Sequence, residues 1–429
     1  MLKVYSVSLG CPKNRVDTEH ALGSLSVPLK PVAQLGRADM VFINTCGFIQ
    51  PAVEESVRVI LETAEHISGL KKRPLLVVAG CMVGRYGVRE LAGELPEVDL
   101  WLPNQRLEEW GEMLAEKLGI PAPVSGRLLS TGPSYAWLKI SDGCRHNCAF
   151  CTIPSIRGPH RSTPAEALVR EARELLDQGV QEITLVAQDV TAWGEDIGEP
   201  HGLRSLLEKL LPLDGLRWLR LLYLYPAGLT PELLTFIAQA GRPLLPYFDI
   251  PMQHADADIL QRMGRPFARD PRLVVDRVRT LVPDAVLRTS LIVGFPGETE
   301  AQFERLHDFV RETRFSHLGV FAYKAEEGTT AAAMPDQVED SVKEWRRDSL
   351  METQAEISAA WLEQFVGRRM DVLVDAPHPE WPGLHTGRVW FQAPEIDGMT
   401  YISGPGVAPG RMVEADVEES ADYDLTALA

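Results

Sequence analysis

Short apolar runs alternate with amphipathic stretches through the first 124 residues. The runs at 3–9, 40–44 and 74–79 each have the length and composition of a buried parallel strand. Between the last two, residues 52–67 place apolar side chains at helical spacing. Because a strand, a helix and a second parallel strand form one βαβ unit, residues 1–124 are predicted to fold as a small doubly wound α/β domain.

Residues 131–366 contain six more strand-like runs that are separated by helical stretches, at 135–140, 182–188, 218–223, 246–250, 286–293 and 317–323. This alternation predicts a (β/α)6 barrel, which is open because the closed form needs eight units. Residues 341–365 then predict a helix whose buried face consists of Val342, Trp345, Ile357, Trp361 and Phe365.

The third region, residues 367–429, is rich in Gly and Pro and has short alternating runs at 370–374 and 387–391. This pattern predicts a small antiparallel β-barrel. From residue 366 onward the chain carries four basic and eleven acidic side chains, a net charge of −7. A β-barrel that grips RNA needs the opposite sign, so this region is not expected to bind nucleic acid.

The whole chain of 429 residues is acidic, with 43 Lys and Arg against 60 Asp and Glu and a formal net charge of −17. Such a charge aids solubility, and it also suits a basic protein partner. No apolar run approaches the ~20 residues of a membrane span. Residues 1–10 lack the long apolar segment of a signal peptide. We therefore expect a cytoplasmic protein that does not contact a membrane.

Three of the six cysteines, Cys144, Cys148 and Cys151, fall within eight residues. A large chain without a secretion signal keeps its thiols reduced, which favours metal ligation over disulfides. Three closely spaced thiolates can ligate three irons of a four-iron cluster and leave the fourth iron open. The alternative is a zinc site with His146 as a fourth ligand.

The other three cysteines, Cys11, Cys46 and Cys81, lie 35 residues apart, and each follows a predicted strand. The carboxyl ends of parallel strands meet at one edge of a sheet, where such sheets bind ligands. We therefore expect a second three-thiol metal site with one open position. Three buried structural cysteines are the alternative.

Polar side chains also follow the predicted barrel strands, where enzymes of this architecture place their active sites. They are Gln188 and Asp189, Tyr225, Gln253 and His254, the segment 294–298, and Tyr323 and Lys324. For Gln188, Asp189 and the segment 294–298, turn formation alone is about as good an explanation. A hydrogen-bonded structural role is the simpler expectation for His254.

Four stretches carry a resemblance to a known family: residues 8–14, 139–144, 153–158, and 375–377 together with 393–398. With the two cysteine sets, they make the chain similar to the radical S-adenosylmethionine (SAM) methylthiotransferases over nearly its full length. The resemblance implies an N-terminal methylthiotransferase domain at 1–124, a radical SAM barrel at 131–366 and a TRAM-like barrel at 367–429. Within that family, the chain resembles most the branch that modifies an aspartate of a ribosomal protein.

This resemblance implies two 4Fe-4S clusters and SAM as cofactors. The cysteines at 144–151 would hold the cluster that cleaves SAM, and Cys11, Cys46 and Cys81 would hold an auxiliary cluster that carries the sulfur. No catalytic side chain beyond these ligands is implied. The candidate contacts to SAM are Phe150, Gln188, Asp189, Gly294, Glu298 and Arg157. Arg157 and Arg161 both suit a contact to the SAM carboxylate or to the substrate's aspartate, and solvated loop arginines are the alternative.

The implied reaction adds a methylthio group to the β-carbon of one aspartate in the twelfth small-subunit ribosomal protein. An acidic enzyme attracts such a basic substrate. A reducing electron donor and a sulfur donor are further implied partners, and nucleic acid is expected only by way of the ribosome. Two alternatives are a tRNA adenosine methylthiotransferase and a non-enzymatic iron–sulfur electron carrier or scaffold.

Overall fold

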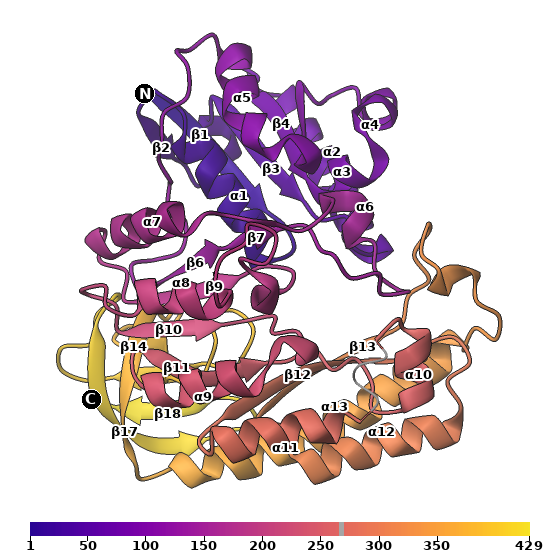
Figure 1. Ribbon diagram of the computed structural model, residues 1–429. Coiled ribbons are helices and arrows are strands. Elements are labelled where there is room, and N and C mark those ends of the chain that lie inside the picture. The colour runs from indigo at the N-terminus through magenta and orange to yellow at the C-terminus, as the bar shows by residue number, and fades with distance from the viewer. Residues whose placement is uncertain (266–269) are drawn as a thin grey trace.

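The computed structural model describes residues 1–265 and 270–429, which form three main sheets in succession (Figure 1). The first is a five-stranded parallel sheet in the order β2-β1-β3-β4-β5. Its strands are β1 (Leu2–Ser8), β2 (Leu29–Pro31), β3 (Met40–Thr45), β4 (Leu75–Gly80) and β5 (Leu100–Pro103). The three strands predicted from the sequence are β1, β3 and β4, and the two short edge strands were not predicted.

Helices cover both faces of this sheet, as the predicted doubly wound domain requires. They are α1 (Pro12–Gly23), α2 (Gln50–Ser68), α3 (Cys81–Tyr86), α4 (Val88–Glu94) and α5 (Trp110–Leu118). Alternate residues of β3 enter different cores: Val41 packs in the cluster that contains Val53 of α2, whereas Phe42 packs in the cluster that contains Trp110 of α5. Burial on both faces explains why β3 is an unbroken apolar run.

The middle sheet has six parallel strands in the linear order β13-β12-β11-β10-β9-β6. Its described strands therefore form an open barrel, which confirms the prediction. They are β6 (Tyr135–Lys139), β9 (Glu182–Val186), β10 (Trp218–Leu221), β11 (Leu244–Asp249), β12 (Val286–Val293) and β13 (His317–Ala322). The helices between and after them are α7 (Ala165–Asp177), α8 (Leu203–Leu210), α9 (Pro231–Ala240), α10 (Ala257–Arg262), α11 (Pro271–Leu281) and α12 (Glu300–Thr313).

The long helix α13 (Asp340–Leu362) follows the barrel and packs against β13 and α12. Its predicted buried face was wrong at Trp345, whose side chain is 54% exposed. The Trp345 ring lies at the edge of the interface, 5.5 Å from the ring of Phe303. The helix instead buries polar positions, because Arg346 reaches Glu298 and Gln354 donates to the Phe315 carbonyl. Apolar periodicity cannot identify a face that is held by polar contacts.

The last region forms a closed five-stranded barrel in the order β14-β15-β16-β18-β17. Its strands are β14 (Arg369–Pro377), β15 (His385–Arg388), β16 (Thr400–Ser403), β17 (Met412–Ser420) and β18 (Leu425–Leu428). The barrel confirms the predicted fold with one departure, because β16 and β18 pair in parallel. The hairpin of β17 and β18 inserts its second strand beside β16, which gives these two strands the same direction. The predicted strand 387–391 ends at Arg388, although Val389 and Phe391 remain buried.

This C-terminal barrel packs on the open barrel, beside β10 and β11 (Figure 1). One apolar core joins Trp137, Trp218 and Tyr247 of the middle sheet to Val372 and Phe391 of the last region. The predicted boundaries at 124, 131, 366 and 367 lie between the sheets and stay a prediction. No helix among the described residues is long and apolar enough to cross a bilayer.

A buried ion-pair group reinforces the same interface. Glu182 of β9 accepts from Arg220 of β10 at 2.7 Å and from Arg388 of β15. Arg388 also donates to both oxygens of Asp375, at 2.8 and 3.0 Å. Glu182 and Arg220 are fully buried, so these charges depend on one another for compensation.

We predict that Arg388→Ala lowers the free energy of unfolding by about 3–5 kcal/mol, because it leaves buried carboxylates short of a partner. Arg369→Ala is the matched control, since the exposed Arg369 lies 3.5 Å from Glu414 on the same barrel. Its loss should be about 1 kcal/mol or less. Urea unfolding followed by tryptophan fluorescence measures both. Equal losses in the two variants would contradict the assigned role of Arg388.

Candidate active site: two facing cysteine sites

Cys11, Cys46 and Cys81 lie at the carboxyl ends of three adjacent parallel strands, as predicted. Cys11 precedes α1, Cys46 directly follows β3, and Cys81 begins α3 directly after β4. The three thiols are close enough for their charges to interact. Burial, with the other two thiols, raises the pKa of Cys81 to about 12, and Arg157 opposes that rise.

Glycines permit the close approach of these cysteine loops. Gly10 has a φ of +81°, and a Cβ there would lie 2.9 Å from both Cβ and Sγ of Cys46. A Cβ on Gly47 would lie 2.7 Å from the backbone of Met82, beside Cys81. No side chain larger than hydrogen fits at either point without moving a neighbour. The sequence context of these cysteines therefore determines how tightly their loops pack.

The second cysteine site is the loop between β7 (Ser141–Asp142) and α6 (Ile153–Arg157). Its ends are fixed by backbone bonds, from Cys144 N to Gly158 O at 3.1 Å and from Cys151 N to Cys148 O at 3.0 Å. Two donors approach the sulfurs: His146 N lies 3.4 Å from Cys144 Sγ, and Arg265 Nη1 lies 3.6 Å from Cys148 Sγ. Hydrogen bonds and positive charge of this kind stabilise thiolate ligands.

The donor set at each site suits an iron–sulfur cluster. All six cysteines are free thiols. Among the described residues, no three Cys, His, Asp or Glu side chains converge closely enough to hold a single metal ion. A four-iron cluster makes a different demand, because each thiolate ligates its own iron. In the part of the chain that the structure describes, the zinc alternative lacks a convergent ligand set for the same reason, although His146 lies beside this loop, with its Nε2 2.7 Å from Asp189 Oδ2 and its ring stacked on Tyr225.

The residues predicted to contact SAM surround the Cys144–Cys151 loop, with one exception. Phe150 packs near Phe295 in a small apolar cluster at the end of β12. Gln188 lies at the end of β9, and both polar atoms of its side chain are buried without a hydrogen-bond partner among the described residues. An orphaned amide at this point fits a bound polar ligand. Asp189 bonds His146 with one oxygen and Thr191 with the other.

Glu298 closes its own loop rather than facing open space. Its Oε2 accepts from the backbone N–H groups of Gly294 and Phe295, at 2.5 and 3.1 Å. Burial raises its pKa to about 7, although Arg346 opposes that rise. His254 is fully buried 3.9 Å away, and burial lowers its pKa to about 3, so it is neutral. Whether these groups or the others contact SAM stays a prediction.

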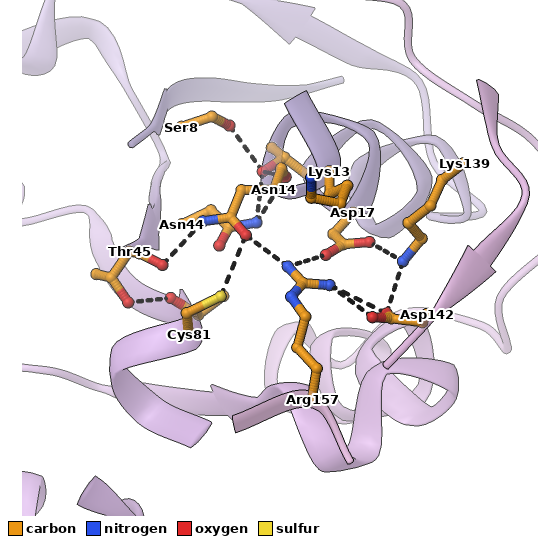
Figure 2. Close-up of polar contacts among 12 residues, drawn as sticks. Ser8, Lys13, Asn14, Asp17, Asn44, Thr45, Cys81, Lys139, Asp142 and Arg157 are labelled. Atoms are coloured by element: carbon orange, nitrogen blue, oxygen red, sulfur yellow. Dashed lines mark hydrogen bonds and ion pairs between the residues drawn. The ribbon is translucent and has the colours of Figure 1, made fainter. Parts of the chain in front are cut away.

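Arg157 is the exception, because it points toward the other cysteine site. It ends the short helix α6, which begins two residues after Cys151. Figure 2 shows its guanidinium between α1 and the 139–142 segment. It donates to Asn14 Oδ1 at 2.6 Å, to Asp17 at 3.0 Å and to both oxygens of Asp142 at 3.0 Å. Arg161, by contrast, is exposed and lies 3.9 Å from Glu108.

Four of these side chains form a charge-balanced group that we call the buried quartet: Asp17 and Arg157, which are buried, and Lys139 and Asp142, which are 11% and 15% exposed. Lys139 bonds both carboxylates, at 2.9 Å in the case of Asp142. Burial alone would raise the pKa of Asp142, but Lys139 and Arg157 hold it well below its usual range. The quartet therefore stays ionised, and it ties the N-terminal domain to the barrel.

The quartet also reaches the Cys11, Cys46 and Cys81 site. Asn14 Oδ1, which accepts from Arg157, also accepts from the Cys81 thiol at 3.5 Å (Figure 2). Burial would raise the pKa of Cys11, but Lys13 and Arg157 bring it below its ordinary value. In addition, Thr152 beside Cys151 donates to the carbonyl of Phe48 at 3.0 Å, two residues after Cys46. The two cysteine sites thus face each other across the domain interface.

Sequence reasoning assigned no role to Lys13, Asn14, Asp17, Lys139 or Asp142. All five belong to or adjoin the stretches 8–14 and 139–144, which were noted only for their resemblance. The available signal was that four of them are charged residues within six positions of a cysteine, at the ends of apolar strands. Such residues are seldom buried unless they are paired.

Three family models match the chain: the uncharacterized protein family UPF0004 at residues 3–103, the Radical SAM superfamily at 138–310 and the TRAM domain at 366–429. The open parallel barrel and its three-cysteine loop therefore define a radical SAM protein. Proteins named ribosomal protein uS12 methylthiotransferase RimO match the chain over its full length. The one from Nitratidesulfovibrio vulgaris strain Hildenborough is 72% identical over 430 residues, with 100% of each chain covered.

Another such relative, from Oleidesulfovibrio alaskensis strain G20, is 64% identical and again covers 100% of both chains. One from Aquifex aeolicus strain VF5 is 43% identical and covers 99% of this chain and 96% of its own. The chain belongs to the RimO family of ribosomal protein uS12 methylthiotransferases.

A solved structure has the same fold at low sequence identity. The radical SAM methyltransferase TsrM from Kitasatospora setae, with tryptophan and a SAM analogue bound, superposes with a TM-score of 0.56 at 13% identity. The match covers 90% of this chain and 78% of that one. Its similarity extends across the N-terminal sheet and the barrel, so the pairing of these two folds is not peculiar to this chain.

We predict that Gly10→Ala empties the Cys11 site, because the new Cβ would occupy space held by Cys46. Gly87→Ala is the matched control, since Gly87 has the same φ of +81° with nothing within 4 Å of its Cβ position. Iron per chain after anaerobic reconstitution should fall from about eight to about four in the first variant and stay near eight in the second. Equal iron in both variants would contradict the packing argument.

Proposed function

We propose that this chain is a radical SAM enzyme that adds a methylthio group to the β-carbon of an aspartate in ribosomal protein uS12. The full-length relatives carry the name of that activity. The observation that carries the proposal is the pair of three-thiol sites, one in each domain, that face each other and are joined by α6 and Arg157. A protein that transferred electrons would have no need to leave a ligand position open at both clusters.

Cys144, Cys148 and Cys151 would hold one 4Fe-4S cluster, and SAM would bind there with Gln188 as a candidate partner. When bound, cluster and SAM supply radical chemistry that removes hydrogen from a saturated carbon, which no general base deprotonates at neutral pH. The chain's own residues hold the reacting groups in place and exclude water. The buried quartet and the tightly packed glycine loops serve that purpose.

Cys11, Cys46 and Cys81 would hold the second cluster and the sulfur that is transferred. Two further partners are needed: a reductant for the radical step, and a sulfur donor that renews what each turnover consumes. The net charge of −17 supports attraction of a basic ribosomal protein at long range. A ribosomal substrate also supports the cytoplasm as the place of action.

We predict that two single-thiol variants lose different steps of the reaction. Cys148→Ser should abolish SAM cleavage to 5′-deoxyadenosine, whereas Cys81→Ser should retain it and lose only methylthio transfer. Each should hold about four irons in place of about eight. Anaerobic assays with labelled SAM and isolated uS12, read by mass spectrometry, measure cleavage and transfer, and metal analysis of each variant measures its iron content.

The same assay with tRNA in place of uS12 separates this proposal from tRNA modification. The wild-type chain should modify uS12 and leave tRNA unchanged. Methylthio groups on tRNA and none on uS12 would overturn the proposal. Iron without any 5′-deoxyadenosine would instead identify an electron carrier.

A further inference from the structure

Lys13 is a buried ammonium group without a carboxylate partner in the described part of the chain. It lies in the first turn of α1, two residues after Cys11, and is 7% exposed. Its Nζ donates to the carbonyl of Ala187 at 3.3 Å and lies 3.7 Å from the centre of the Tyr223 ring. An ammonium has three N–H donors, and burying it without an anion is costly.

The carboxylates nearby are already committed to other cations. Asp17 and Asp142 each bond both Lys139 and Arg157, so the buried quartet is neutral by itself. Neither carboxylate is therefore left for Lys13, whose nearest anionic neighbour is the Cys11 thiolate two residues away. Only one of the three N–H donors of Lys13 has a hydrogen-bond acceptor among the described residues. A buried ammonium with unfilled donors can bind an anion that arrives from outside.

Lys13 also lies where a substrate is expected. Ala187 directly follows β9 and adjoins Gln188, and Tyr223 follows β10 by two residues. These are carboxyl ends of barrel strands, the edge at which such barrels bind substrates. Lys13 reaches this edge from the Cys11 loop, so its ammonium lies where the N-terminal domain meets the strand ends of the barrel.

We propose that Lys13 binds the carboxylate of the aspartate that is modified. This inference rests on the proposed function. The β-carbon of aspartate is bonded directly to the carboxyl carbon, so holding the carboxylate places the reacting C–H bond one bond away. Pairing with the buried ammonium fixes that carbon between the two sites. It also offsets the free-energy cost of removing the substrate carboxylate from water. A nucleobase carries no such carboxylate, so the same contact selects protein over tRNA.

A double-mutant cycle on the anaerobically reconstituted full-length chain tests the pairing. Its four arms combine wild type or Lys13→Gln with uS12 or with uS12 whose modified aspartate is replaced by asparagine. The dissociation constant of each pair is measured, together with iron per chain. Either single change should weaken binding about tenfold to a hundredfold, and the second change should add little once the first is made.

Lys13→Arg, which keeps the charge, should recover part of the affinity for the aspartate substrate alone. Lys30→Gln is the control, because Lys30 is an exposed lysine on β2 of the same domain. It should bind both substrates as wild type does. With the wild-type enzyme, the KM for uS12 that carries asparagine should be higher than the KM for uS12 that carries aspartate. More 5′-deoxyadenosine should also form per methylthio group transferred.

Two results would overturn the inference. If the wild-type enzyme binds both substrates equally, no group of the enzyme recognises the carboxylate. This comparison uses no enzyme variant, so it does not depend on a variant that folds. Losses that add in full show that Lys13 acts elsewhere, for instance by offsetting the charge of the Cys11 thiolates, which would also alter iron content with either substrate. If wild type does not modify uS12 at all, the proposed function itself fails, which is a separate outcome.

Discussion

A neutral group of four charged side chains, two buried and two largely buried, holds the two cysteine sites of this protein against each other. Arg157 lies six residues after Cys151 and bonds Asn14, which lies three residues after Cys11. Asp17, Lys139 and Asp142 complete the group from α1, β6 and the following segment. Removing one member of a buried ion group leaves an uncompensated charge, so the arrangement resists any change in the relative position of the two domains.

Other contacts across the interface depend on the same relative position of the two domains. Arg85 of α3 lies 2.9 Å from Glu326, which also accepts from the backbone N–H of Gln50 at 2.8 Å. Thr152 bonds the Phe48 carbonyl beside Cys46. The interface thus brings the loops after β1, β3 and β4 to the open end of the barrel at several points. Radical chemistry requires such a closed interface, because the substrate radical has to react with the sulfur before solvent reaches it.

Charge divides recognition into two stages that act at different distances. The acidic exterior, with a net charge of −17 for the chain, attracts a basic protein from a distance. At the interface the group proposed to bind the substrate has the opposite sign, because Lys13 has no share in the carboxylates of the neutral quartet. A basic substrate with one carboxylate at the reacting position satisfies both stages.

Much of the fold could be predicted because it follows from apolar periodicity. Strand β12 was predicted with its observed bounds, and the meeting of Cys11, Cys46 and Cys81 followed from parallel strand ends. The quartet could not be predicted, since it depends on which side chains approach across two domains more than 100 residues apart in sequence. The predicted burial of Trp345 was wrong for a related reason, because polar contacts position α13.

The most direct test of the central claim is pulsed electron paramagnetic resonance of the reduced, reconstituted chain. Dipolar coupling falls with the cube of the distance between spins, so it reports whether the two clusters face each other. We predict a dipolar splitting in wild type that disappears in the chain with Cys81→Ser. A wild-type spectrum equal to the sum of the Cys81→Ser and Cys148→Ser spectra would contradict the account.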